Sequence, residues 1–144
     1  MKWSITNFTN VRYMNEHQLP LSTAKFPPSF FKKTSINTNN VITGITCSEL
    51  VAKQQCECPC QTKDYKHCDF LKEYHEQLSK LNFKDFMSNI NKFVFKLENL
   101  TNTNITEIVL LVYERSDNLC SERTVLKKWF DENGVILNEM EISK

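Results

Sequence analysis

Apolar and polar positions alternate near the N-terminus of the chain and follow a helical period through much of its second half. The stretch "WSITNF" alternates and contains a β-branched residue, which predicts a first strand. "LPLSTAKFPPSFF" predicts a second strand that ends at Pro27 and Pro28, because proline cannot continue a hydrogen-bonded ladder. The Thr/Asn-rich residues 32–46 predict a loop, and "SELVAKQ" predicts a short helix capped by Ser48.

Two amphipathic helices are predicted in the middle of the chain. "DFLKEYHEQLSKL" places apolar residues at helical spacing behind Asp69, which we expect to be its N-cap. "FKDFMSNINKFVFKLENL" repeats the pattern, and "TNTN" breaks it. Both stretches predict helices that bury one apolar face.

The C-terminal third predicts a strand, a helix and a second strand. "ITEIVLLVYE" is a nearly continuous apolar run, which is typical of a central strand covered on both faces. "CSERTVLKKWFDENG" predicts a helix with Gly134 at the C′ position, and "VILNEMEI" predicts a closing strand. Such a unit is a right-handed βαβ crossover with parallel strands. We therefore expect residues 1–144 to form one α/β domain, a small sandwich with a mainly parallel sheet and a C-terminal βαβ unit.

Composition and charge narrow the class of protein. The 144 residues are 40% hydrophobic and 24% charged, as in an ordinary globular domain. A net charge of +1 argues against a dedicated duplex-DNA binder but leaves room for a nucleotide. No apolar run reaches the roughly 20 residues of a membrane span, and the N-terminus lacks a signal-peptide pattern, so we expect a cytoplasmic protein with no membrane partner. The abundance of Asn, Lys and Ile is typical of AT-rich genomes, such as those of phages and low-GC bacteria.

A cysteine-rich insertion is predicted at about residues 47–68. Its segment "CECPCQTKDYKHC" offers four soft ligands that suit tetrahedral zinc, namely Cys56, Cys58, Cys60 and Cys68. His67 or Cys47 could replace one of them. The C-x-C-x-C spacing is tighter than the usual C-x2-C knuckle, so thiols that bind no metal are the alternative. If zinc binds, every ligand comes from the protein and the site is structural.

The strand-to-helix corner "ERSDNLCSER" is the second candidate site. Cys120 is expected at the first turn of a helix, where the helix dipole and free N–H groups favour a thiolate or a bound anion. Arg123 could bind a phosphate oxygen, whereas Glu114 and Glu122 oppose both a thiolate and a phosphate. Three interpretations remain open: a plain helix start, an anion-binding corner, and a nucleophile.

The stretch "VLLVYERSDNLCSERTVLKKWFDENGVILNEM" resembles the C-terminal signature of domain of unknown function 488, the YeaO-like family. That signature has a strand, Tyr-Glu-Lys, a short loop, Cys-His-Arg, a helix with a Trp, Asn-Gly and a final strand. The positions that match are Tyr113, Glu114, Arg115, Cys120, Trp129, Asn133 and Gly134. "WSITNF" and "LSTAKFPPSFF" are similar to the family's first two strands.

This chain departs from the family at "CSER", where the histidine is absent and the arginine falls one position later. Ser121 cannot act as an acid or base at neutral pH. If the site of the family is catalytic, this chain would therefore have lost the reaction while keeping the pocket. The resemblance implies that Asn7 and Lys25 face Glu114, Asp117, Cys120 and Arg123 across one cleft.

Two functions follow as hypotheses. In the first, the protein binds a phosphate-bearing ligand, a nucleotide or a nucleic-acid end: Lys25 and Arg123 neutralise charge, and Asn7 and Ser121 form hydrogen bonds. Whether it is an enzyme stays open; an enzyme would use Cys120 as nucleophile and Glu114 or Asp117 as proton carrier. In the second, it is a zinc-stabilised protein-interaction module, such as a phage-encoded inhibitor of a host protein or a sponge for a signalling nucleotide.

Overall fold

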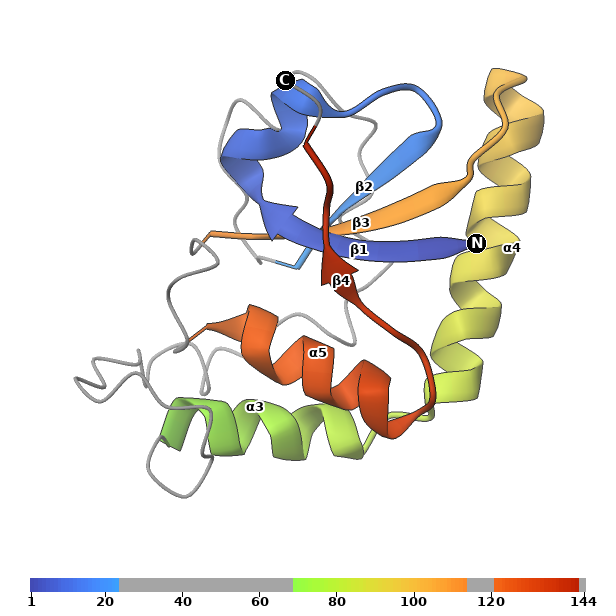
Figure 1. Cartoon of the computed structure of the whole chain (residues 1–144). Helices are drawn as coiled ribbons and strands as arrows, with labels where there is room; N and C mark the ends of the chain where they lie inside the picture. The colour runs from blue at the N-terminus through green and yellow to red at the C-terminus, as the bar shows by residue number, and fades with distance from the viewer. Residues whose placement is uncertain (24–68, 114–120, 143–144) are drawn as a thin grey trace.

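Figure 1 shows the computed structural model of the chain, which describes residues 1–23, 69–113 and 121–142. Several predicted features lie outside these residues: the loop at 32–46, the helix after Ser48, and the cysteine-rich insertion. Among the described residues, no helix is both long and apolar enough to cross a membrane.

Four parallel strands form one sheet, which confirms the predicted α/β fold with a parallel sheet. They are β1 (Lys2–Asn7), β2 (Gln18–Ser22), β3 (Glu107–Val112) and β4 (Asn138–Glu139), in the order β2-β3-β1-β4. The closing strand is only two residues long, and it pairs with β1 instead of β3. The connection from β3 through the following helix therefore crosses β1 before the chain rejoins the sheet as β4.

Strand β3 is covered on both faces, as its apolar run predicts. Its side chains at positions 108, 110 and 112 join the larger hydrophobic core, whereas those at 109 and 111 join a smaller one. All five are at most 1% exposed. The alternation follows from the strand's period of two, which sends successive side chains to opposite faces.

Three helices cover the first face of the sheet: α3 (Asp69–Ser79), α4 (Phe83–Thr101) and α5 (Glu122–Glu132) (Figure 1). Aromatic side chains of α4 and α5 meet Trp3 of β1 in a cluster. The ring centroids of Trp3 and Phe130 are 5.1 Å apart, and those of Phe83 and Phe130 are 5.3 Å apart. Burial of several aromatic rings holds the helices to the sheet.

The helix ends differ from two of our expectations. Asp69 lies inside the first turn of α3 and is not its N-cap. Helix α5 begins at Glu122 and not at Cys120, because the Ser121 side chain accepts the Arg123 backbone N–H at 3.0 Å and so caps the helix. Gly134 follows α5 with a φ of 78°, as expected for a C′ glycine.

The opposite face carries a short 3-10 helix, η1 (Phe8–Tyr13), which directly follows β1. Phe8 and Val11 of η1 pack with Val109, Leu111 and Met140 in the smaller core. The sheet is thus covered by α-helices on one face and by η1 on the other. The connection after β1 therefore runs over one face of the sheet, and the connection after β3 runs over the other.

Candidate functional site

Strands β1 and β3 lie side by side, and their carboxyl ends meet where Asn7 is paired with Val112. From β1, the chain continues through η1 on the second face and reaches β2 at one side of β3. From β3, it continues through α5 on the first face and reaches β4 at the other side of β1. The two connections leave on opposite faces and move in opposite directions, which makes this point a topological switch. Open α/β sheets bind ligands at such a crevice.

Asn7 lies at this edge in a small network of side-chain amides and hydroxyls. Its Oδ1 accepts from Asn10 Nδ2 at 3.1 Å, and its Nδ2 donates to Thr9 Oγ1. Asn10 Nδ2 also donates to Thr6 Oγ1 at 2.8 Å. The network fixes the first turn of η1 and holds the Asn7 side chain at the edge, whereas a contact of Asn7 with a ligand stays a prediction.

Thr23 joins the end of β2 to the start of α5. Its hydroxyl oxygen lies 2.8 Å from the Leu111 carbonyl oxygen and 2.8 Å from Glu122 Oε2, so one proton is shared between two acceptors. Thr23 is fully buried, and its backbone N–H donates to the same Leu111 oxygen at 3.1 Å. Glu122 is thereby held at the carboxyl-end edge. Our sequence reasoning missed Thr23, although a polar residue directly after an alternating strand is a recognisable signal.

Tyr113 follows β3 at the same edge. Its ring centroid is 5.0 Å from that of Phe8, and the residue is 53% exposed. Partial burial and, second, the negative charge of Glu122 raise the pKa of the Tyr113 phenol above its ordinary value of 10.0. The phenol is therefore a neutral hydrogen-bonding group near neutral pH.

Arg123 is buried under the first turn of α5, with 3% of its surface exposed. Its Nε lies 2.8 Å from Glu139 Oε1 on β4, and Lys127 Nζ lies 2.9 Å from the same oxygen. A buried guanidinium needs such a carboxylate, because an unpaired charge is expensive to remove from water. The arrangement gives Arg123 a structural role, and its contact with a ligand stays a prediction.

The structure brings Asn7 and Ser121 to the same edge of the sheet. Apart from Arg123, the other predicted site residues lie outside the part of the chain that the structure describes: Lys25, Glu114, Asp117, Cys120, and the zinc ligands Cys56, Cys58, Cys60 and Cys68. Within the described residues, no three side chains of the metal-binding types are grouped to hold an ion. The zinc site and the cysteine nucleophile therefore stay predictions.

The described edge offers neutral hydrogen-bonding side chains, Asn7, Thr9 and Tyr113, together with the Glu122 carboxylate and the start of α5. Such a set can recognise a polar ligand by hydrogen bonds. No protein-family model, curated protein or solved structure matches this chain.

Proposed function

We propose that this chain binds a phosphate-bearing ligand, a nucleotide or a nucleic-acid end, at the carboxyl-end edge of its sheet around Cys120 and Arg123. The observation that carries the proposal is the switch point between β1 and β3, where Asn7 and Val112 are paired. The likeness of "VLLVYERSDNLCSER" to the YeaO-like signature supports the same location, because its distinctive residues fall between β3 and α5.

The start of α5 supports a phosphate group as part of the ligand. Helix α5 has 11 residues, and the first N–H groups of a helix, with the positive end of its dipole, attract anions. Ser121 takes up one of these N–H groups, that of Arg123. In the proposal, Lys25 contacts the phosphate, and Arg123 adds positive charge from behind the first turn while its Nε stays with Glu139.

Glu122 supports a nucleotide over inorganic phosphate. Its carboxylate is held at the edge by Thr23 and repels a bare anion, but it accepts hydrogen bonds from hydroxyl or amino groups. A nucleotide carries such donors on its sugar and base, at a distance from its phosphate. The Tyr113 phenol adds a neutral donor on the same side.

Calorimetric titration with a nucleoside monophosphate, the matching nucleoside and inorganic phosphate tests the proposal. We expect the monophosphate to bind most tightly, Lys25→Ala to weaken the phosphate-bearing ligands, and Glu122→Gln to weaken the nucleoside but not inorganic phosphate. Asp131→Asn, near the far end of α5, is the matched control and should change nothing. The proposal would be overturned if none of the three compounds bound. It would also be overturned if Lys25→Ala and Glu122→Gln weakened the binding of every compound by the same factor.

The enzymatic form of the proposal adds Cys120 as nucleophile and Glu114 or Asp117 as proton carrier. It requires that Cys120→Ala abolish turnover of a bound nucleotide while leaving its binding affinity unchanged. Turnover that survives in Cys120→Ala would leave a binding protein or a different chemistry.

A second candidate, a zinc-stabilised protein-interaction module, is favoured by the outer surface of α4. A shallow groove of about 640 Å³ runs there, lined in part by Phe83, Met87 and Phe95. Phe95 is 68% exposed, and the charged side chains of the lining are Lys84 and Lys92, which suits an acidic peptide with apolar anchors.

Native mass spectrometry of protein purified without chelator tests the zinc in this candidate. One bound zinc ion, lost in Cys58→Ser or Cys60→Ser, is the expected result. Binding of a synthetic acidic amphipathic peptide that Phe95→Asp removes, and Asn89→Asp does not, is expected for the groove. A chain that carries no zinc and binds no such peptide would exclude this candidate.

A further inference from the structure

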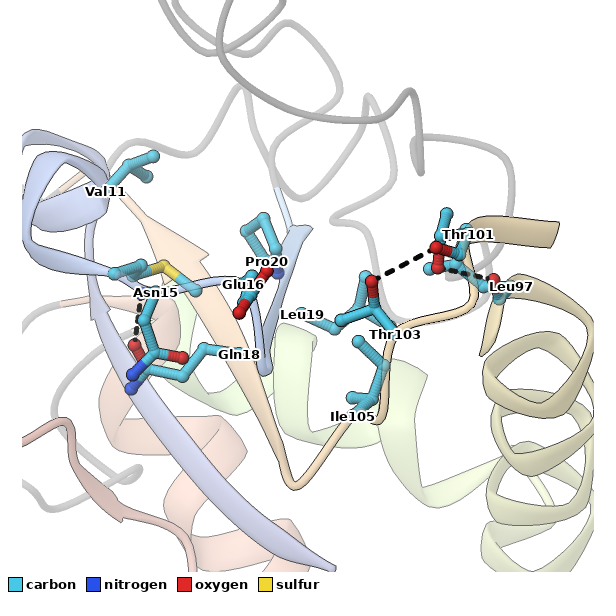
Figure 2. A pocket seen from close by; sticks show the side chains of 11 residues that line it. Val11, Asn15, Glu16, Gln18, Leu19, Pro20, Leu97, Thr101, Thr103 and Ile105 are labelled. Atoms are coloured by element: carbon cyan, nitrogen blue, oxygen red, sulfur yellow. Dashed lines mark hydrogen bonds between the residues drawn. The ribbon is translucent and has the colours of Figure 1, made fainter. Parts of the chain in front are cut away.

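A separate cavity of about 390 Å³ lies at the amino-terminal edge of the sheet, opposite the edge of the proposed nucleotide site (Figure 2). It opens between three parts of the fold: η1 with the loop that follows it, the first residues of β2, and the last turn of α4 with its connection to β3. Its volume is within the range of small-molecule sites.

The wall of the cavity is mainly apolar. Of the eleven lining residues in the described part of the chain, six are hydrophobic: Val11, Met14, Leu19, Pro20, Leu97 and Ile105. They come from η1 and the residue after it, β2, α4 and the α4–β3 connection, so the tertiary fold and not one local turn forms the wall. An apolar body in this space would remove hydrophobic surface from water.

The polar side chains of the wall are mostly committed to the protein itself. Gln18 Nε2 donates to Glu107 Oε1 at 3.1 Å, and Gln18 Oε1 accepts the Asn15 backbone N–H at 2.9 Å. The Thr101 hydroxyl donates to the Leu97 carbonyl at 2.8 Å, and the Thr103 hydroxyl donates to the Thr101 carbonyl at 3.2 Å (Figure 2). These bonds hold the wall in shape.

Two features make the cavity favour positive charge. Among the lining residues that the structure describes, Glu16 is the one with a charged side chain, and its carboxylate, 74% exposed, contacts His17 Nε2 at 3.5 Å. The C-terminal turn of α4, which supplies Leu97 and Thr101, contains no basic residue. A helix C-terminus carries a partial negative charge, and here the threonine hydroxyls bond its carbonyls without adding a positive charge.

We infer that this cavity binds a small apolar molecule with a positively charged amine head. The apolar body lies against Leu19, Leu97 and Ile105, and the amine lies near Glu16 and the end of α4. This site is independent of the proposed nucleotide site, because it uses different residues at the other end of the strands.

The test uses three compounds that share one apolar body: 3-phenylpropylamine, 3-phenylpropanol and 3-phenylpropionate. Each is titrated into the full-length ¹⁵N-labelled protein at pH 8, where the amine is charged. We expect the amine to shift the backbone amide signals of Leu19, Thr103 and Ile105, with an affinity at least about tenfold higher than that of the carboxylate, a ratio set by opposite signs of charge near Glu16. The neutral alcohol should fall between them.

Two variants and one control complete the test. Glu16→Gln should lower the affinity of the amine to that of the alcohol and leave the alcohol unchanged, and this exposed substitution leaves the buried wall in place. Thr103→Phe should fill the cavity and abolish binding of all three compounds, whereas Asn89→Phe, on an exposed position of α4, should not. Equal binding of amine and carboxylate, shifts confined to other parts of the protein, or an amine affinity unaffected by Glu16→Gln would overturn the inference.

Discussion

The guanidinium Nε of Arg123 lies 2.8 Å from Glu139 Oε1, which ties the first turn of α5 to the short strand β4. Arg123 is nearly fully buried, whereas the Glu139 side chain is 38% exposed. The ion pair therefore supplies the carboxylate that a buried guanidinium requires, and it holds a strand with only two ladder residues in place.

Glu139→Gln is expected to lower the free energy of unfolding by about 2 kcal/mol, because the buried Arg123 guanidinium loses the negative charge that Glu139 places 2.8 Å from its Nε. Urea denaturation followed by tryptophan fluorescence measures the change. Glu141→Gln, an exposed position on the same segment, is the control and should stay within about 0.5 kcal/mol of the parent. Equal stability of the two variants would contradict the structural role of Arg123.

Phe130→Ala is expected to be the more damaging of two phenylalanine truncations. Phe130 is fully buried and lies against Trp3, Phe83 and Trp129, so its removal leaves a cavity and should cost about 3–5 kcal/mol. Phe95→Ala removes the same side chain from a position that is 68% exposed, and it should cost less than about 1 kcal/mol. Chemical denaturation of both variants gives the comparison, and similar losses would contradict the core placed around Phe130.

The strands show what the sequence could reveal and what it could not. The run in β3 predicted a central strand because five consecutive apolar residues can only be buried on two faces. The apolar pattern of "VILNEMEI" predicted a strand too, but Leu137 and Met140 are apolar because they enter the two opposite cores. That pattern depends on tertiary packing, so the ladder of β4 is shorter than the pattern implied.

Helix η1 left a signal that we did not use. Phe8, Val11 and Met14 recur every three residues, which is the period of a 3-10 helix, and all three pack in the smaller core. The partner of Arg123 could not be predicted in the same way, since Glu139 reaches it only after the chain has crossed β1. Local sequence patterns thus predicted helices and strands, whereas the structural role of Arg123 depends on a contact with Glu139 of a distant strand.

Gly134→Ala is expected to destabilise the protein by about 1 kcal/mol. Gly134 has a φ of 78°, which an L side chain rarely adopts, although no atom lies within 4 Å of the position where a Cβ would stand. The cost is therefore one of backbone conformation alone. Asn102→Gly is the matched control. Asn102 ends α4 with a φ of 55°, and glycine adopts this left-handed conformation without strain.

Thermal and urea unfolding of these two variants check the backbone argument. Asn102→Gly should leave the stability within about 0.5 kcal/mol of the parent, since asparagine already tolerates the left-handed region. An unchanged stability in Gly134→Ala would mean that α5 ends in another conformation in solution.

The Tyr113 phenol is expected to titrate above the ordinary tyrosine value of 10.0. Burial raises its pKa most and the Glu122 carboxylate raises it further, so Glu122→Gln should lower the pKa only part of the way back. Because the folded-state pKa is higher than the unfolded one, the stabilising contribution is complete below about pH 10 and is lost as the pH rises through the folded-state value. NMR titration of ¹³C-labelled tyrosine, with the Tyr113 signal assigned from Tyr113→Phe, measures this pKa. A Tyr113 pKa at or below 10.0 would contradict the placement of the phenol beside Glu122 at the carboxyl-end edge, and so would a pKa that returned fully to 10.0 in Glu122→Gln.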